Sequence, residues 1–362
     1  MQRLPRAAKT HKGADNVVFF RGIEILNKSI LKFTRKDIEV YVVVEKAIIT
    51  NLFDELTPYF SIREIDVLPS NKWTIYSNEK FSTEKNLQVI YGTSSEGPEN
   101  KILLNTNNKT VIVPEEDVAW KIKYIARLVR NLSRWQLYRS GYFYLHGGAV
   151  QINGHGLAFL GKKKSGKTSS ILSSLINLSA DYVTNDDLTV KIDKNGAFNL
   201  LGWPRAIGIR TDVLSEFQRL EKYLKGDLFH PANQYVNEKG KVYVSPKELT
   251  KFNDSEIIPE TNLSAIVFPV FNSNQNQPVI KRLEPNDAFK LLLNNVEKFP
   301  DKHSDYFIGV FEIMDMEEIK SILKTASQEI PCYQLIQSMN SINDGAKLLN
   351  EIAKDISQVS NY

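Results

Sequence analysis

Short apolar runs separated by polar turns characterise the first third of the chain. The run IEVYVVVEKAII at residues 38–49 is rich in β-branched residues and predicts a strand. Further short strands are predicted at residues 62–68, 73–76, 87–91 and 110–113. Residues 94–108 are polar and contain Gly97 and Pro98, so we expect a loop there. The pattern predicts a separate α+β unit over residues 17–113, which serves as a scaffold or a recognition domain.

A helical period follows this unit. Pro114 and the three acidic residues after it are typical of a helix start, and apolar residues then recur at helical spacing as far as Leu132. Arginines accumulate toward the end of the segment, at positions 127, 130, 134 and 139. We expect a connecting helix over residues 114–141 whose arginines form a solvated basic face. An acidic partner for these arginines is the alternative.

The pattern changes again at residue 142. Residues 144–152 and 155–160 are both β-like, and the Asn153-Gly154 pair between them predicts a hairpin with a type I′ turn. The second strand runs directly into a glycine- and lysine-rich loop, and a helical pattern of apolar residues begins at Ser169. The loop consists of Gly161, Lys162, Lys163, Lys164, Ser165, Gly166, Lys167 and Thr168. This is the G-x-x-x-x-G-K-[ST] pattern of a phosphate-binding loop, in the strand-to-helix context that the pattern requires.

Each part of this loop suits a nucleotide polyphosphate. Backbone N–H groups and the dipole at the helix start attract anions, and Lys167 would reach the β- and γ-phosphates. Thr168 would offer its hydroxyl to Mg²⁺. The simpler interpretation, a lysine-rich surface turn, does not account for the acidic pair Asp186-Asp187 at the end of the next predicted strand. Adjacent carboxylates can provide both the metal ligand and the base that phosphoryl transfer needs.

Composition narrows the classes of function. The chain has 362 residues, 42% of them hydrophobic, and a net charge of +4, which is small for a dedicated nucleic-acid binder. Cys332 is the single cysteine, so an intrachain disulfide is excluded and we expect a small buried side chain. No apolar run approaches the ~18 residues of a membrane span, and the basic residues 1–16 lack the apolar core of a secretory signal. We expect a flexible tail at residues 1–16, no membrane partner and a cytoplasmic location.

Taken together, the motifs resemble a known family. LHGGAV at residues 145–150, the hairpin, the phosphate-binding loop and YVTNDD at residues 182–187 resemble the catalytic domain of HPr serine kinase/phosphorylase, and more distantly the phosphoenolpyruvate carboxykinases. GWPRAIGI at residues 202–209 and VSPKEL at residues 244–249 are similar to stretches of the HPr-kinase-related group that accompanies peptide-modification genes. The resemblance covers residues 143–270 and is weaker to about residue 340. It implies an α/β fold in which a P-loop core with a mixed sheet, over residues 142–362, follows the smaller α+β unit.

The resemblance also implies roles for individual residues. Asp186 would take the proton from an acceptor hydroxyl and Asp187 would hold Mg²⁺ together with Thr168, although the sequence does not decide which carboxylate does which. His146 matches the family histidine before the hairpin and would orient the carboxylates or the phosphate. Arg205 matches the family arginine, whose guanidinium suits the oxygens of the transferring phosphoryl group.

Three features depart from the family pattern. Lys164 stands where the family usually has a glycine, and Trp203 stands where it has a glutamate before the arginine. The PGRN-containing segment of true HPr kinases is absent from the sequence. The first two features weaken the case for efficient catalysis, and the third argues against HPr as the substrate.

These observations predict an ATP- and Mg²⁺-dependent kinase that phosphorylates a hydroxyl. The resemblance points to serine or threonine of a peptide or protein, as in the tailoring of a ribosomally made peptide. The first unit would recognise the acceptor or support a homo-oligomer, and residues 221–260 would form a lid or acceptor-binding insertion, or a plain surface insertion. Two alternatives stay open: a non-catalytic nucleotide-binding regulatory module and a kinase of small-molecule hydroxyls.

Overall fold

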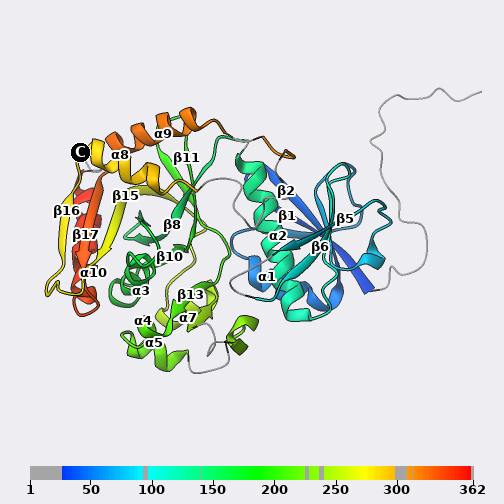
Figure 1. Cartoon of the computed structure of the whole chain (residues 1–362), viewed down its shortest axis with the longest axis horizontal. Coiled ribbons are helices and arrows are strands. Elements are labelled where there is room, and N and C mark those ends of the chain that lie inside the picture. Colours follow the sequence, from blue (N-terminus) through cyan, green and yellow to red (C-terminus); the bar gives the residue numbers. More distant parts are fainter. Residues whose placement is uncertain are drawn as a thin grey trace, which may run out of the picture.

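The computed structural model describes residues 27–92, 97–138, 140–224, 228–235, 240–297, 307, 309–312 and 314–359. The tail expected at residues 1–16 lies outside the described residues. The chain has a mixed α/β fold with two large mixed sheets, and a long helix, α2 (Val118–Tyr138), lies at the boundary between them (Figure 1).

The first sheet has seven strands in the order β3-β1-β2-β4-β7-β6-β5. The central pairs β2–β4 and β4–β7 are parallel, and the other neighbouring pairs are antiparallel. Its elements are β1 (Lys28–Arg35), β2 (Ile38–Glu45), η2 (Lys46–Ile48), α1 (Ile49–Leu56), β3 (Ser61–Ile65), β4 (Thr74–Tyr76), η3 (Glu79–Phe81), β5 (Gln88–Gly92), β6 (Asn100–Asn105) and β7 (Thr110–Ile112). Two expectations differ from this arrangement. The strand expected at residues 38–49 ends at Glu45, where the chain turns into η2 and α1, and the loop expected at residues 94–108 contains β6, whose apolar centre is buried.

The second sheet has eight strands in the order β10-β8-β11-β12-β15-β17-β16, with β9 paired to both β8 and β15. Strand β15 runs parallel to β9 and β17, and the remaining pairs are antiparallel. Its strands are β8 (Phe143–Ile152), β9 (His155–Leu160), β10 (Asp181–Thr184), β11 (Asp187–Ile192), β12 (Phe198–Leu201), β15 (Glu260–Phe271), β16 (Val279–Arg282) and β17 (Cys332–Gln337). Its helices are α3 (Lys167–Leu178), α8 (Pro285–Asn294), α9 (Met316–Glu329) and α10 (Ile342–Val359).

Alternating residues of β9 pack into two different apolar clusters, one on each face of the second sheet. Leu157 and Phe159 belong to the apolar cluster that contains α3 and α10, whereas Ala158 and Leu160 belong to the cluster that contains α8, α9 and the first sheet. Successive side chains of a strand point to opposite faces, so a strand covered on both sides is apolar throughout. The predicted hairpin is confirmed: β8 and β9 pair across Asn153 and Gly154, which have φ angles of 51° and 82°.

A smaller group of elements lies between α3 and the first unit. It contains a two-stranded antiparallel sheet and short helices. These are β13 (Ile207–Arg210), α4 (Thr211–Leu214), α5 (Gln218–Tyr223), η4 (Pro231–Tyr235), β14 (Lys241–Val244) and α7 (Pro246–Asn253). The group includes most of the insertion expected at residues 221–260. Ser245 and Glu248 form a capping box at the start of α7, which explains locally why the VSPKEL stretch turns into a helix.

Helix α2 is buried on most of its circumference. It packs on β2, β4 and α1, and its apolar residues share one continuous core with both sheets. The helix begins at Val118 rather than at Pro114, because Asp117 caps it by accepting a hydrogen bond from the Trp120 N–H at 2.9 Å. The solvated basic face expected for α2 is wrong at two positions. Arg134 is 2% exposed and Arg130 is half-buried, and both lie against an acidic partner in the same chain.

Two further expectations concern burial and hydropathy. Cys332 is a free thiol on β17 and is 2% exposed, so the prediction of a small buried side chain is confirmed. No helix among the described residues is both long and apolar enough to cross a membrane.

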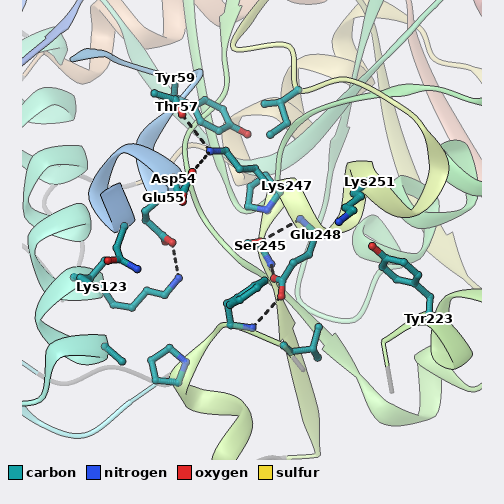
Figure 2. Close-up of a pocket in the computed structure, with 18 residues that line it drawn as sticks. Asp54, Glu55, Thr57, Tyr59, Lys123, Tyr223, Ser245, Lys247, Glu248 and Lys251 are labelled. Carbon is teal, nitrogen blue, oxygen red and sulfur yellow. Dashed lines mark hydrogen bonds and ion pairs between the residues drawn. The ribbon is translucent and has the colours of Figure 1, made fainter. Parts of the chain in front are cut away.

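A cavity of about 580 Å³ lies where α1, the first turns of α2 and the segment from α5 to α7 meet (Figure 2). Its lining includes Asp54 and Glu55 from α1, Lys123 from α2, and Lys247 and Lys251 from α7. The phosphate-binding loop is not part of this lining.

Candidate functional site

The phosphate-binding loop connects β9 to the N-terminus of α3. A Cβ atom on Gly161 would lie 2.6 Å from Ser165 Oγ, so the close approach of Gly161 and Ser165 within the loop favours glycine at the first position. Gly166 precedes the helix at φ 109°, a conformation that favours glycine. Lys164 also has a positive φ, 68°, where the family usually has glycine. The loop therefore makes the left-handed turn with a lysine, at a cost in backbone strain.

Lys167 lies inside the loop rather than on the surface. Its side chain is largely buried, and Nζ donates hydrogen bonds to the carbonyl oxygens of Gly161 at 2.6 Å and Lys162 at 3.2 Å. Burial lowers the pKa of Lys167, and the negative charge of Asp186 opposes this shift. The ammonium group is thus held at the mouth of the loop, close to a carboxylate.

The other residues of the loop differ in how far their side chains are exposed to solvent. Lys162, Lys163 and Lys164 are exposed, Thr168 is half-buried and Ser169 is buried at the start of α3. Ser165 Oγ is buried and has no hydrogen-bond partner among the described residues. An orphaned hydroxyl inside the loop suits a ligand that accepts or donates a hydrogen bond there.

Asp186 and Asp187 lie between β10 and β11 but in different surroundings. Asp186 is half-buried in the turn, with φ 64°, and Asp187 begins β11 and is 1% exposed. In the antiparallel pairing of β11 with β8, Asp187 lies opposite His146. Strand pairing thus brings the family histidine next to the acidic pair, although 40 positions of the sequence separate His146 from Asp186.

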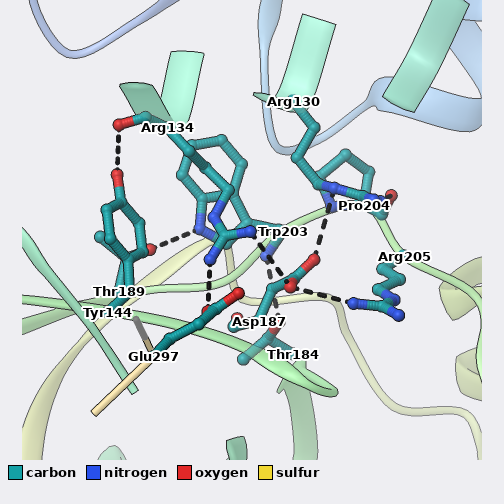
Figure 3. Close-up of polar contacts among 10 residues, drawn as sticks. All are labelled: Arg130, Arg134, Tyr144, Thr184, Asp187, Thr189, Trp203, Pro204, Arg205 and Glu297. Atoms are coloured by element: carbon teal, nitrogen blue, oxygen red, sulfur yellow. Dashed lines mark hydrogen bonds and ion pairs between the residues drawn. The ribbon is translucent and has the colours of Figure 1, made fainter. Parts of the chain in front are cut away.

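Three arginines surround the carboxylate of Asp187 (Figure 3). Arg205 Nη1 and Arg134 Nη1 lie 3.0 and 3.3 Å from Oδ1, and Arg130 Nε lies 3.3 Å from Oδ2. Burial alone would raise the pKa of Asp187, but the charges of Arg205, Arg134 and Arg130 outweigh it and hold the pKa well below its usual range. Asp187 is therefore an ionised, buried group whose Oδ1 accepts hydrogen bonds from Arg134 and Arg205, while Oδ2 lies at ion-pair distance from Arg130.

Arg134 is itself fixed by a second carboxylate and by an aromatic ring. Its Nη2 lies 2.6 Å from Glu297 Oε2, and its guanidinium lies 4.5 Å from the ring centre of Tyr144, whose hydroxyl donates to the Arg134 carbonyl. Sequence reasoning missed Arg130, Arg134 and Glu297. The sequence did contain a signal for Arg130 and Arg134. They are four residues apart and so share one face of a helix whose many apolar residues leave little room for a solvated face.

Trp203 occupies the position where the family has glutamate. Its side chain is fully buried, its indole N–H donates to Thr189 Oγ1 at 2.7 Å, and its backbone N–H donates to Thr184 Oγ1 at 3.2 Å. The guanidinium of Arg35, on β1, lies 4.4 Å from the Trp203 ring centre. Trp203 therefore contacts both the first sheet and the two strands on either side of Asp186. It positions the neighbouring Arg205 but contributes no carboxylate.

The structure gathers the remaining candidates around His146. The His146 side chain is exposed, and its backbone N–H donates to the carbonyl of Asn295 at 2.8 Å. Partial loss of hydration lowers the pKa of His146, and the nearby charges of Lys167 and Arg205 lower it further, while Asp186 and then Asp187 oppose the shift. Strand pairing places these residues in one region at the N-terminal end of α3. Gly147 of β8 pairs with Leu160 directly before the loop, and His146 pairs with Asp187, which Arg205 contacts.

The residues present fit a magnesium–nucleotide complex. Among the described residues, no three His, Cys, Asp or Glu side chains gather as a metal-binding group. Mg²⁺ in nucleotide sites is usually held by one or two protein ligands together with phosphate oxygens and water. Thr168, at the second position of α3, and the half-buried Asp186 supply such ligands beside the orphaned Ser165 hydroxyl.

Comparison with known proteins gives a distant structural likeness. No protein-family model matches the chain, and no curated protein matches it. The chain is similar to the solved structure of the Hpr(Ser) kinase/phosphatase from Coxiella burnetii, with 10% sequence identity, a TM-score of 0.29, and coverage of 60% of this chain and 99% of that chain. At this identity and TM-score the match carries no argument about function.

Proposed function

We propose that the protein is a kinase that transfers the γ-phosphoryl group of ATP to a hydroxyl, with Mg²⁺. The observation that carries the proposal is that β8 pairs with the strand before the loop and with β11, which brings His146, the Asp186-Asp187 pair and Arg205 to the N-terminus of α3, where Lys167 lies. A helix N-terminus with a lysine binds polyphosphate, and a nearby half-buried carboxylate can serve an incoming hydroxyl.

Each residue has a role in the proposed transfer. The α3 N-terminus and Lys167 bind the β- and γ-phosphates, and Arg205 stabilises charge on the transferring group. Asp186 accepts the proton of the acceptor hydroxyl as its oxygen bonds to the γ-phosphorus and the bond from phosphorus to the bridging oxygen of ADP breaks. Bound Mg²⁺, held by Thr168, would neutralise charge on the β- and γ-phosphates.

Asp187 receives a different role from the one expected. We expected it to hold the metal, but both of its oxygens face arginines. We assign it to positioning Arg205, since a buried carboxylate fixes a guanidinium in one orientation.

A second candidate, a non-catalytic nucleotide-binding module, is favoured by one observation. Trp203 is fully buried where a carboxylate would otherwise serve the metal, and its ring packs against Phe60 and the Arg35 guanidinium. The two candidates differ in chemistry but share nucleotide binding.

The test is phosphate transfer from γ-labelled ATP with Mg²⁺ to a mixed pool of peptides and small hydroxyl compounds. We expect label on an acceptor with the wild type, loss of nucleotide binding in Lys167→Ala, and loss of transfer with retained binding in Asp186→Asn. Lys281→Ala, an exposed lysine on β16, is the matched control and should behave as the wild type. Tight binding of ATP with neither transfer nor hydrolysis would favour the non-catalytic module.

A further inference from the structure

We propose that the cavity between α1, α2 and α7 binds the acceptor, and that the acceptor is an acidic peptide segment anchored there by an apolar side chain. This inference rests on the proposed kinase function and names its substrate class. The cavity volume of about 580 Å³ falls within the roughly 300–1,000 Å³ of pockets that enclose whole ligands.

The walls of the cavity come from both units of the chain. Ala119, Ile122 and Lys123 lie on α2, Asp54 and Glu55 on α1, and the opposite wall includes Tyr223, Phe229 and α7. Phe229 is 82% exposed and Tyr223 is 42% exposed. Large apolar side chains at the rim of a pocket are typical of surfaces that bind a partner.

Of the charged side chains described in the lining, Lys251 is the one whose ammonium group makes no contact with a carboxylate (Figure 2). Glu55 pairs with Lys123 at 2.6 Å, and Asp54 pairs with Lys247 at 3.2 Å. Glu248 accepts hydrogen bonds from the backbone N–H groups of Phe229 at 2.9 Å and Ser245 at 2.7 Å. Lys251 is exposed and has no carboxylate partner among the described residues. The lining holds three carboxylates and three lysines, so its formal charge is balanced. Because backbone N–H groups rather than a lysine satisfy Glu248, the ammonium of Lys251 stays available to a carboxylate of the occupant.

A narrow gap leads from the cavity toward Asp187. This gap, of about 20 Å³, shares Glu55 and Lys123 with the cavity, and Arg130 and Arg205 with the arginine cluster around Asp187. The inner wall of the cavity also contacts the strand that leads to Asp186, because the Tyr59 hydroxyl donates to the carbonyl of Val183 at 3.2 Å. The cavity is therefore connected to Arg205 by the gap and to the strand that precedes Asp186 by the Tyr59 hydrogen bond.

The length of α2 between the two sites favours a peptide over a small molecule. Arg130 follows Lys123 by seven positions on α2, which corresponds to about 10 Å along the helix axis. The arginines around Asp187 lie outside the lining of the cavity, and about three residues of extended chain span the distance from Lys123 to Arg130. We infer that the phosphorylated hydroxyl lies about three residues from the apolar anchor, with an acidic residue near the anchor to pair with Lys251.

The test compares two cavity variants with matched controls. Ala119→Trp fills the cavity from an exposed helix position, and Val118→Trp places the same side chain on the neighbouring exposed position outside the lining. Lys251→Glu reverses the unpaired charge, and Lys281→Glu makes the same change on β16. The substrates are a library of serine peptides in which a Phe-Glu or Phe-Lys pair stands one to six residues from the serine, and Mg²⁺–ATP binding is measured separately for every variant.

We expect the wild type to prefer Phe-Glu peptides with a spacing of about three residues. Lys251→Glu should lower kcat/KM for these peptides by roughly three- to tenfold, mainly through KM, and relax the preference toward Phe-Lys. Ala119→Trp should lower kcat/KM at least tenfold, while both controls and all ATP affinities stay unchanged.

Two results would overturn the inference while leaving nucleotide binding intact. One is unchanged kcat/KM for peptides in Ala119→Trp and Lys251→Glu. The other is a wild type that binds ATP but phosphorylates only small hydroxyl compounds or no member of the library. A wild type that does not bind Mg²⁺–ATP contradicts the proposed function itself, and the inference falls with it.

Discussion

Asp186 and Asp187 are chemically identical neighbours with opposite environments. Asp186 is half-buried in a turn beside Lys167, and Asp187 is buried among three arginines. An ion pair inside a protein is strongly destabilising when only one partner is removed, because the other charge stays buried. The two residues should therefore respond differently to the same substitution.

Asp187→Asn should reduce the free energy of unfolding by about 3 kcal/mol, because it removes the buried negative charge that the three arginines share. Asp186→Asn, the same change one position earlier, should alter it by less than about 1 kcal/mol. Urea unfolding followed by circular dichroism measures both. Equal stability of the two variants would contradict the structural role assigned to Asp187.

The stabilising effect of Asp187 should also depend on pH. The folded-state pKa of Asp187 is depressed, so its contribution is fully present above the unfolded-state pKa of about 4 and is lost as pH falls below it. The stability difference between the wild type and Asp187→Asn should thus be constant from pH 5 to 7 and shrink between pH 4 and 2. Urea titrations across this range provide the measurement, and a difference that grows on acidification would refute the sign.

Lys164→Gly should stabilise the protein by about 0.5–1 kcal/mol, because glycine adopts the left-handed conformation of this position without strain. Lys163→Gly, in the same loop at an ordinary φ, is the control and should be neutral or slightly destabilising. Thermal unfolding of both variants is the measurement. A loss of stability in Lys164→Gly would mean that the lysine side chain contributes more than the strain costs.

Helix α2 shows which elements a sequence can predict and which contacts it cannot. The β8–β9 hairpin and the start of α3 follow from local signals, Asn153-Gly154 and the spacing of the loop glycines. The ion pairs of Arg134, in contrast, connect α2 to Asp187 and to Glu297, which are 53 and 163 positions away from Arg134 in the sequence. Local periodicity carries no information on such partners, so the arginines were expected in solvent. Strand β6 was missed because its short apolar centre lies between polar residues.

Arg134→Met should destabilise the protein by about 3 kcal/mol, since it removes a buried partner of both Asp187 and Glu297. Arg127→Met, on the same helix and without contact to Asp187, should cost less than about 1 kcal/mol. Chemical denaturation distinguishes the two variants. Similar stabilities would show that the buried ion pairs break even with an apolar side chain of similar length.

At the scale of the whole molecule, the two sheets share one core. Arg35 of β1 stacks on Trp203, and its Nη2 donates to the Pro259 carbonyl at 2.9 Å. Burial lowers the pKa of Arg35 to about 10, which reflects how completely this contact is enclosed. Sequence patterns separated the chain into an accessory unit and a catalytic unit, but they gave no indication that Arg35 of the first unit would pack on Trp203 of the second.

A fragment of residues 140–362 should therefore not fold to a stable, cooperative structure on its own. It would expose Trp203 and the apolar residues that pack on α2, and it would remove two of the three arginine partners of Asp187. Circular dichroism and thermal unfolding of the fragment beside the whole chain provide the check. A sharp transition of the fragment at the same temperature as the whole chain would contradict this prediction.

The two ends of α2 lie at different sites, the first turns along the cavity and the later turns around Asp187. Because one helix contacts both sites, its length sets the distance between them. If the proposed acceptor lies along the first turns, the helix that contacts it also carries Arg130 and Arg134, two of the arginines around Asp187.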